Sequence, residues 1–265
     1  MGTFAISGSA SGMGAATRSR LEAAGHRVVG MDLRNAEVIA DLGTAEGRSE
    51  AVDAVAGAAG GVLNGAVSAA GLGPPVAGEL ITRVNYFGSV AMLEGLRPLL
   101  AASGSAQVVQ FGSNSSTTTP NLPDELVAAC LQGREEDAVA LVNEVDPVFA
   151  PAVAYGAAKL AVTRWCRRTA VTDQWVGEGI RLNVIAPGPV DTPLLRQGQA
   201  DEVYGPLTEA FPVPMHETPD ADALAQWVEF LLSPVARFAC GSVCYVDGGT
   251  DALMRADDWP RSFTM

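Results

Sequence analysis

Basic and metal-binding residue types are scarce in this 265-residue sequence. Lys159 is its only lysine, histidine occurs twice, and the four cysteines show no Cys-x-x-Cys spacing. So few histidines and such scattered cysteines argue against a Ser-His-Asp triad and against a metal centre, and we predict no metal site. In a cytosolic chain these cysteines are expected to be reduced and buried.

Positive charge and long apolar runs are also lacking. The formal net charge of −13 argues against nucleic acid and anionic membrane surfaces as partners, because both recognise basic patches. No uninterrupted stretch of about 20 apolar residues is present, and residues 1–6 show no basic segment typical of a secretion signal. We therefore expect a soluble, cytoplasmic protein that binds neither membrane nor nucleic acid.

Hydrophobic residues make up 48% of the sequence, enough for one large core. No linker or internal repeat divides the chain, so we predict a single domain over residues 1–265. Short β-branched runs alternate with helical stretches, a pattern typical of a parallel sheet covered on both faces. The fold class is thus α/β, a Rossmann-type doubly wound parallel sheet of about seven strands. The predicted strands are Thr3–Ser7, Arg27–Met31, Glu37–Ala40, Gly65–Ala69, Ala106–Phe111, Ile180–Ile185 and Ser242–Val246.

Amphipathic or apolar stretches predict helices between these strands, over approximately 12–25, 46–58, 78–101, 155–177 and 220–232. One connection, 114–152, is too long for a simple strand-to-helix turn. Its apolar spacing fits two short helices, Leu126–Gln132 and Arg134–Val145, separated by Gly133. We therefore predict an inserted helical segment between the fifth strand and the helix of Tyr155.

A glycine-rich turn joins the first strand to the first helix. Glycines let the backbone approach a pyrophosphate, and the helix N-terminus favours its charge. The second strand ends at Asp32, where a carboxylate can bind both hydroxyls of an adenine ribose and repel a 2′-phosphate. Ser11 offers such a phosphate no countercharge, although Arg34 is close in sequence, so the pattern favours NAD over NADP. The predicted cofactor residues here are Gly8, Ser11, Gly12, Met13, Gly14, Asp32 and Leu33.

Asp41 and Leu42 follow the third predicted strand. At the carboxyl end of a parallel strand they are placed to contact the adenine of a dinucleotide. An ordinary strand-end turn explains them equally well, so the sequence leaves both interpretations open.

The single lysine follows Tyr155 by one helical turn, so the two side chains share a face. A tyrosine with a pKa of about 10 is a poor base at neutral pH. An ammonium about 4 Å away, at an effective dielectric constant near 20, favours the phenolate by roughly 4 kcal/mol. That equals about 3 pKa units, so the pair predicts a proton-transfer site. The alternative is that an arginine-rich composition left one lysine at this position.

Taken together, these motifs resemble the short-chain dehydrogenase/reductase family over essentially the whole chain. The matching pieces are Gly8-x-x-x-Gly12-Met13-Gly14, Asp32, Asp41, Ala69-Ala70-Gly71, Val84-Asn85, Ser113, Tyr155-x-x-x-Lys159, Asn183, Pro187-Gly188-Pro189-Val190-Asp191-Thr192 and Asp247-Gly248-Gly249. The resemblance implies an NAD(P)-dependent oxidoreductase acting on CH–OH groups. Its catalytic residues would be Asn85, Ser113, Tyr155 and Lys159. Its cofactor contacts would also include Tyr155, Lys159, Ala70, Gly71, Pro187, Gly188, Val190 and Thr192.

The resemblance also implies individual roles. Ser113 would hold the substrate oxygen, Lys159 would bind the nicotinamide ribose, and Asn85 would carry a water linked to Lys159. Ser115 and Ser116 follow closely, so the identity of the catalytic serine is open among the three. The alternative role for Asn85 is a buried amide that bends or caps its helix.

The segment 192–216, directly after the nicotinamide loop, is typical of a lid over an apolar pocket. The inserted helices, Leu253, Met254 and Trp259 would complete the walls. The alternative is that the bulky residues of this segment form local core. They are Leu194, Leu195, Val203, Tyr204, Leu207, Phe211, Val213 and Met215.

Within the family, several stretches are similar to the bacterial 3α-hydroxysteroid dehydrogenase/carbonyl reductases, among them residues 36–42 and 247–255. This similarity implies an NAD-dependent enzyme that interconverts a hydrophobic secondary alcohol and its ketone. A coniferyl-alcohol-type or terpenoid alcohol dehydrogenase is the alternative enzyme, and a non-catalytic NAD-binding sensor or scaffold is the alternative outside catalysis. Family members form dimers or tetramers through helices that flank the active site, so the resemblance implies a homodimer or homotetramer. Because the insertion lies beside one of those helices, a dimer formed through another face is the alternative.

Overall fold

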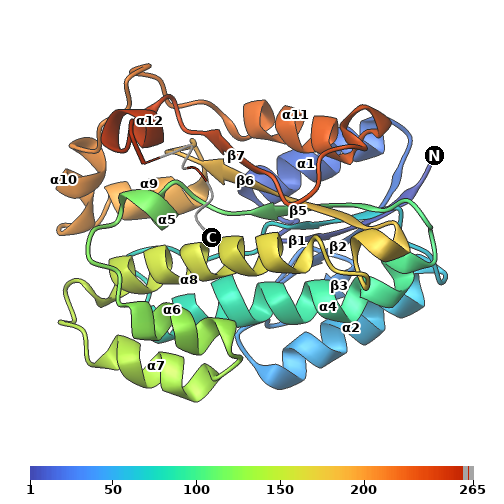
Figure 1. Ribbon diagram of the computed structural model, residues 1–265, viewed down its shortest axis with the longest axis horizontal. Helices are drawn as coiled ribbons and strands as arrows, with labels where there is room; N and C mark the ends of the chain where they lie inside the picture. Colours follow the sequence, from blue (N-terminus) through green and yellow to red (C-terminus); the bar gives the residue numbers. More distant parts are fainter. Residues whose placement is uncertain (259–261, 263–265) are drawn as a thin grey trace.

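The computed structural model describes residues 1–258 and 262. Within them, seven strands form one parallel sheet in the order β3-β2-β1-β4-β5-β6-β7. The strands are β1 (Thr3–Ser7), β2 (Arg27–Asp32), β3 (Val38–Ile39), β4 (Gly65–Ser68), β5 (Gln107–Phe111), β6 (Arg181–Pro187) and β7 (Val243–Val246). Helices cover both faces of the sheet (Figure 1). The predicted doubly wound α/β fold is therefore confirmed, strand for strand.

Two helical layers enclose the sheet. One consists of α1 (Gly12–Ala23) and α11 (Ala221–Leu232), and the other of α2 (Ala45–Ala59), α4 (Ser89–Ala101) and α8 (Ala150–Thr169). Side chains along a strand alternate between the layers, because successive residues point to opposite faces. Ile6 thus packs with the α1–α11 layer, whereas its neighbour Ala5 packs with the opposite core.

The strand order changes direction between β1 and β4, which are hydrogen-bonded neighbours. β2 and β3 lie on one side of β1, and β4 to β7 follow on the other side. In such sheets ligands bind in the crevice at the carboxyl ends of the strands beside this point. The segments that follow the carboxyl ends of β5, β6 and β7 carry short helices, which gather at one end of the molecule (Figure 1). They are α5 (Ser115–Thr118), α9 (Pro193–Gln199), α10 (Tyr204–Glu209) and α12 (Thr250–Met254).

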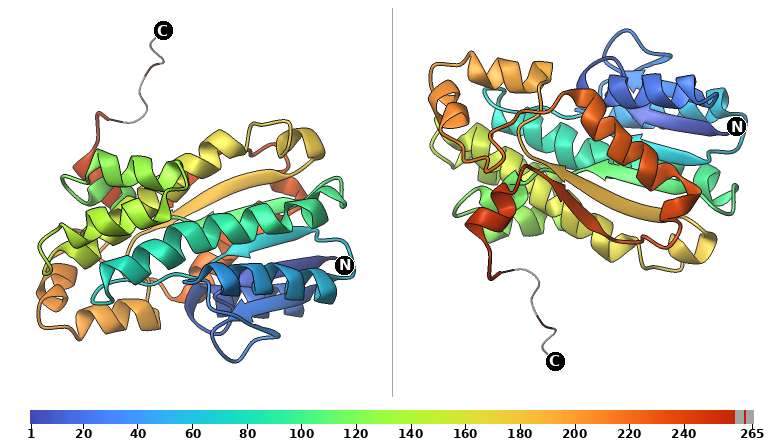
Figure 2. Two further views of the ribbon diagram at one scale, coloured as in Figure 1. Left: turned by 90° about the horizontal axis from the view of Figure 1, so that it is seen from below. Right: turned by 90° about the horizontal axis from the view of Figure 1, so that it is seen from above.

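The predicted insertion forms a helical hairpin, α6 (Asp124–Leu131) and α7 (Glu135–Asn143). Gly133 separates the two helices with a φ of +72°, a conformation that glycine adopts without a Cβ penalty. Both helices pack against α8, outside the layer that covers the sheet (Figure 2). The insertion thus lies close to the helix of Tyr155, as predicted.

Two predicted helices differ from those observed. The stretch 78–101 is divided into α3 (Gly78–Thr82), a π-helical turn (Arg83–Gly88) and α4. The stretch 155–177 begins earlier, at Ala150, because Pro151 is tolerated in a first helical turn. It also ends at Thr169, and a 3₁₀ turn follows at Val176–Glu178. A second 3₁₀ turn, Pro234–Ala236, follows α11. No helix in the described part of the chain is long and apolar enough to cross a bilayer.

Candidate active site

A cleft of about 390 Å³ opens at the carboxyl ends of β1, β2 and β4. Most of the predicted cofactor residues line it: Gly8, Ser11, Gly12, Met13, Gly14, Asp32, Leu33, Asp41, Leu42, Ala70, Gly71 and Thr192. Asp41 and Leu42 therefore do more than turn the chain, because they form part of the wall. Of the other predicted cofactor residues, Pro187 ends β6 and Val190 is buried in the core beside α11.

The glycine-rich turn has the geometry needed to hold a phosphate. Gly8 and Gly12 adopt φ values of +69° and +53°, and a Cβ on Gly14 would lie 2.1 Å from the Gly8 carbonyl oxygen. Ser11 is the N-cap of α1, yet no side chain of the described residues caps this helix end. The backbone N–H groups of the first turn are thus free to bind oxygen atoms of a pyrophosphate. The cleft therefore fits the predicted dinucleotide.

Backbone amides hold Asp32 at the end of β2. One carboxylate oxygen accepts a hydrogen bond from Ala10 N at 3.0 Å, and the other accepts one from Leu33 N at 2.8 Å. The glycine-rich turn and the carboxylate are therefore fixed relative to each other before any ligand arrives. Each oxygen retains a lone pair for a ribose hydroxyl.

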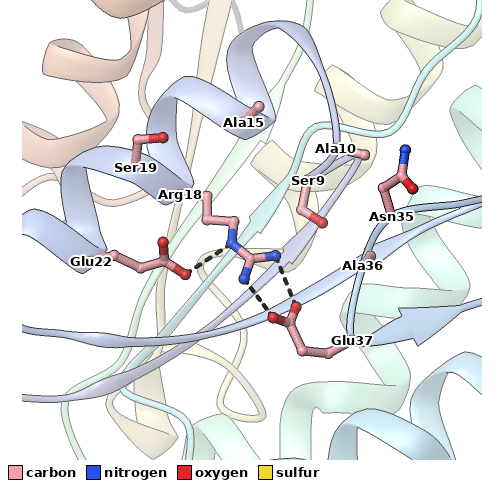
Figure 3. Close-up of a pocket in the computed structure, with 9 residues that line it drawn as sticks. All are labelled: Ser9, Ala10, Ala15, Arg18, Ser19, Glu22, Asn35, Ala36 and Glu37. Atoms are coloured by element: carbon pink, nitrogen blue, oxygen red, sulfur yellow. Dashed lines mark hydrogen bonds and ion pairs between the residues drawn. The ribbon is translucent and has the colours of Figure 1, made fainter.

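A second groove, of about 580 Å³, lies on the outer side of this turn, between α1 and the loop after β2 (Figure 3). Its basic side chain is Arg18, which is held between Glu22 and Glu37. Burial and these carboxylates act on the guanidinium in opposite directions, and the hydrogen bond to Glu37 is the largest influence, so its pKa is raised. Because Arg18 is already paired, this groove has no free cation among its lining residues for a 2′-phosphate.

Tyr155 and Lys159 lie one turn apart on α8, and Ser113 follows β5 beside them. The Lys159 Nζ is 5.8 Å from the centre of the Tyr155 ring and donates a hydrogen bond of 2.8 Å to the Phe111 carbonyl oxygen. The Ser113 side chain lies close enough to the Tyr155 phenol to lower its pKa. A Cβ placed on Gly71 would lie 3.7 Å from Lys159 Nζ, so this ammonium lies beside the cleft wall. The three predicted catalytic side chains are thus brought together.

Protein groups by themselves do not acidify Tyr155 as the sequence predicts. Burial raises the pKa of the phenol above its ordinary value of 10.0, and the Ser113 side chain opposes this only in part. Burial also lowers the pKa of Lys159 to about 8, since among the described residues no carboxylate contributes to its shift. The expectation of a lowered tyrosine pKa is therefore wrong for the protein alone, because desolvation penalises both charged forms.

Among the three serines, Ser113 is the one whose side chain acts on the pKa of Tyr155. The Ser116 hydroxyl donates instead to the Ser113 carbonyl oxygen at 2.7 Å, and within the described chain the Ser115 hydroxyl has no hydrogen-bond partner. The Ser115 backbone N–H donates to Ser113 Oγ at 3.1 Å, which orients that oxygen. The geometry therefore favours Ser113 among the alternatives.

Asn85 lies in the π-helical turn and is fully buried. Its amide exchanges two hydrogen bonds of 2.8 Å with the backbone of Leu72, accepting from its N–H and donating to its carbonyl oxygen. Because Leu72 lines the cleft, this side chain fixes the cleft wall to the irregular helix. These two bonds link the helix to the loop after β4, a contact that neither of the predicted roles describes.

The predicted lid segment is mostly exposed rather than packed into core. Of its bulky apolar side chains only Tyr204 is buried, and its hydroxyl donates to the Val148 carbonyl oxygen at 2.6 Å. Thr250 in α12 donates to the Pro212 carbonyl oxygen at 2.7 Å, which ties α12 to the lid. These exposures disfavour the local-core alternative. Trp259, a predicted wall residue, lies outside the described residues.

Several cleft residues were not predicted, because isolated aliphatic side chains give no motif. They are Met31, Ala40, Leu72, Val76, Leu80 and Pro193. Ala69 and Val84, which belong to the predicted family motifs, and Leu194, which was predicted as part of the lid, line the cleft as well. Leu194 lies in α9, and a Cβ on Gly73 would approach its side chain to 3.0 Å, so the start of the lid reaches across the cleft. Ser7 was also missed: its hydroxyl accepts hydrogen bonds from Ala69 N and Ala70 N at 3.2 Å each.

Comparison with known proteins agrees with the fold and the site. A family profile described as Enoyl-(Acyl carrier protein) reductase matches residues 141–251. The chain is 40% identical over 257 residues to the 3-alpha-hydroxysteroid dehydrogenase/carbonyl reductase of Comamonas testosteroni, which covers 96% of this chain and 98% of that protein. The chain therefore belongs to the short-chain dehydrogenase/reductase family and is an oxidoreductase, so the predicted family and enzyme class are confirmed.

Two further relatives bear on the particular activity. The crystal structure of the 3-alpha-hydroxysteroid dehydrogenase from Pseudomonas sp. B-0831, complexed with NADH, matches with a TM-score of 0.89 and 43% identity, over 96% of this chain and 99% of that chain. The coniferyl-alcohol dehydrogenase of Pseudomonas sp. (strain HR199) is 29% identical over 92% of this chain and 94% of that protein. The predicted resemblance to the hydroxysteroid dehydrogenases is thus confirmed at the level of sequence and fold.

Proposed function

We propose that this protein is an NAD-dependent oxidoreductase that interconverts a hydrophobic secondary alcohol and its ketone, with hydroxysteroids as the substrate class. The single observation that carries the proposal is the grouping of Ser113, Tyr155 and Lys159 beside the wall of a cleft that fits a dinucleotide. The identity with two hydroxysteroid dehydrogenases over nearly the whole chain supports the choice of substrate class.

NAD supplies the acceptor or donor of hydride when it is bound. The N-terminus of α1 would hold its pyrophosphate, Asp32 its adenine ribose, and Asp41 with Leu42 its adenine. Lys159 would reach the nicotinamide ribose from the side of Gly71. The fixed carboxylate of Asp32 and the paired state of Arg18 both favour NAD over NADP.

Tyr155 would exchange the proton of the reacting oxygen, and Ser113 would position that oxygen by a hydrogen bond. Since burial raises the pKa of the phenol, Tyr155 is protonated at neutral pH and is ready to donate to a ketone oxygen. Alcohol oxidation needs the opposite form, so we expect it to be favoured at alkaline pH.

The apolar character of the substrate is supported by exposed side chains from three segments near the site. The lid is joined to Val148 through Tyr204 and to α12 through Thr250, so these segments are adjacent. A cluster of exposed apolar groups at the surface of a folded chain is typical of a binding site. The exposed residues in these segments are Val148, Phe149, Leu207, Met215, Leu253 and Met254.

The test is NADH formation from NAD with androsterone, coniferyl alcohol and terpenoid alcohols, for the natural chain and for Tyr155→Phe. We expect the steroid to react, and we expect Tyr155→Phe to lower kcat by roughly 10³-fold while NADH binding persists. The matched control is Tyr245→Phe, which removes a phenol oxygen on β7 and is expected to keep activity.

Each alternative has its own outcome in this test. Faster turnover of coniferyl alcohol than of androsterone would replace the substrate class and keep the mechanism. NADH binding without turnover of any alcohol or ketone would instead identify a sensor or scaffold. Equal activity of Tyr155→Phe and the natural chain would refute the proposed role of the phenol.

We also propose that the protein associates with a second copy through the face of α11 and the turn before β7. The α8 face is covered by α6 and α7, which leaves this side of the molecule for an interface. Trp227 and Phe230 on α11 are about half exposed, Val235 is 74% exposed, and Phe238 is fully exposed. Large apolar side chains gathered in this way are typical of protein interfaces.

A further inference from the structure

A buried arginine joins the inserted hairpin to the cofactor cleft. Arg48 lies in the first turns of α2, and only 8% of its side chain is exposed. Its guanidinium donates to the carbonyl oxygens of Leu42 (2.8 Å), Gly43 (3.3 Å) and Arg83 (3.2 Å). Its Nη1 and Nη2 also form a two-pronged ion pair with Glu135 of α7, at 2.6 and 2.8 Å. Four separate segments thus meet at one side chain.

Two of these segments are walls of the cleft. Asp41 and Leu42 line it directly, and Val84, which follows Arg83 in the π-helical turn, lines it as well. The loop is tightly built: Asp41 accepts a hydrogen bond from Gly43 N at 2.8 Å, and a Cβ on Gly47 would lie 2.2 Å from the Asp41 carbonyl oxygen. A displacement of the Leu42 carbonyl would therefore move the whole loop.

The carboxylate of Glu135 is what allows the guanidinium to remain buried. A buried charge without a partner is strongly unfavourable, and the three carbonyl oxygens carry only partial charge. Glu135 is itself shared with Arg83, whose nitrogen lies 2.9 Å away, while Arg83 also pairs with Glu136 and Glu79. Burial raises the pKa of Glu135, but the hydrogen bond and charge of Arg48, with those of Arg83, hold it below its ordinary value.

We propose that Glu135 of the inserted hairpin is a positioning residue for the adenine end of the cofactor, acting through Arg48 on the loop Asp41–Gly43. The proposal rests on the assignment of the cleft to NAD made above. It gives the insertion a function in cofactor binding, separate from any part it has in the substrate pocket. Glu135 touches neither the cleft nor the reacting atoms, so its effect is on affinity and not on the chemical step.

The test compares Glu135→Gln with Glu136→Gln in the full-length protein. The two residues are adjacent on α7, but Glu136 is 78% exposed, and within the described part of the chain its ion pair and side-chain hydrogen bonds are with Arg83 alone. Binding of NADH and of ADP-ribose, which lacks the nicotinamide, is measured by calorimetry. We expect Glu135→Gln to weaken both ligands by about fivefold and Glu136→Gln to leave both unchanged.

Three further measurements distinguish a positioning role of Glu135 from a general loss of protein stability. In Glu135→Gln the KM for NAD should rise by the same factor while kcat at saturating NAD is unchanged. Amide hydrogen exchange in the unliganded variant should increase in residues 41–44. Glu135→Asp, which keeps the charge but shortens the side chain, should give a smaller loss and provides the measurement if Glu135→Gln does not fold.

The outcomes distinguish this proposal from the proposed function. If Glu135→Gln or Glu135→Asp is folded and binds ADP-ribose as tightly as the natural chain, Glu135 has no positioning role. If NADH binding weakens but ADP-ribose binding does not, the effect is not at the adenine end and the proposal is overturned. If the natural chain binds neither ligand, the assignment of the cleft fails instead.

Discussion

Replacing Lys159 by methionine should stabilise the unliganded protein at neutral pH. Burial lowers the pKa of this ammonium from 10.5 to about 8, a difference that corresponds to about 3 kcal/mol. Below pH 8 the folded state bears this full cost, because the lysine is charged in both states. Between pH 8 and 10.5 the folded state releases its proton while the unfolded state keeps it, so stability rises with pH in that window.

The methionine variant lacks this cost but also loses one hydrogen bond, worth about 1 kcal/mol. The Phe111 carbonyl oxygen is not left without a donor, since Gln110 Nε2 donates to it at 2.9 Å. We therefore expect Lys159→Met to be about 2 kcal/mol more stable than the natural chain at pH 7. Near pH 10.5 the order should reverse, with the natural chain more stable by about 1 kcal/mol.

Urea unfolding of both proteins at pH 7 and pH 10 measures their unfolding free energies. Subtracting the value for the natural chain from that for Lys159→Met at each pH cancels the contribution of groups that titrate in both proteins. Because Lys159 is the only lysine, ¹³C labelling of lysine at Cε gives one resonance whose titration reports its pKa directly. Lys159→Arg is the control: its charge stays buried at both pH values, so its stability relative to the natural chain should fall between pH 7 and pH 10, where the natural lysine loses its proton. A stability difference between Lys159→Met and the natural chain that is the same at pH 7 and pH 10, or a lysine pKa near 10.5, would refute the reasoning.

Three further predictions concern the glycine-rich turn, the proton-transfer residue and the proposed interface. Gly14→Ala places a Cβ 2.1 Å from the Gly8 carbonyl oxygen, so we expect a loss of about 3 kcal/mol in unfolding free energy and no calorimetric NADH binding. Gly57→Ala lies in the exposed part of α2 with nothing within 4 Å of the new Cβ, so it should instead stabilise the protein by about 1 kcal/mol. A loss of stability in Gly57→Ala would contradict the inference of stability changes from the distances around the new Cβ. Since the pKa of Tyr155 is raised above 10.0, kcat/KM for alcohol oxidation should increase with pH up to about 10, and a plateau near pH 7 would contradict that direction. Phe238→Asp should convert the dimer to a monomer in sedimentation velocity, whereas a natural chain that sediments as a monomer would refute the interface.

Local sequence patterns were sufficient to predict the strands, the longer helices and the residues of the glycine-rich turn. The strands are short β-branched runs, and the Gly8–Gly14 turn and Asp32 stand at strand ends, so their meeting at one sheet edge follows from parallel topology. The helical hairpin after β5 was visible from apolar spacing and Gly133. The short helices α5, α9, α10 and α12 were not predicted, because four to seven residues are too few to show a helical period.

What the amino-acid order alone determined was the fold class, the glycine-rich turn and the spacing of Tyr155 and Lys159, all of which depend on neighbours in the chain. Tertiary structure decided the electrostatics of the site. Burial raises the pKa of Tyr155 and lowers that of Lys159, an effect that no spacing predicts because it depends on how far each group is removed from water. It also decided the contact of Arg48 with Glu135, since residues so far apart in the chain meet only when the hairpin packs beside α2 and the π-helical turn.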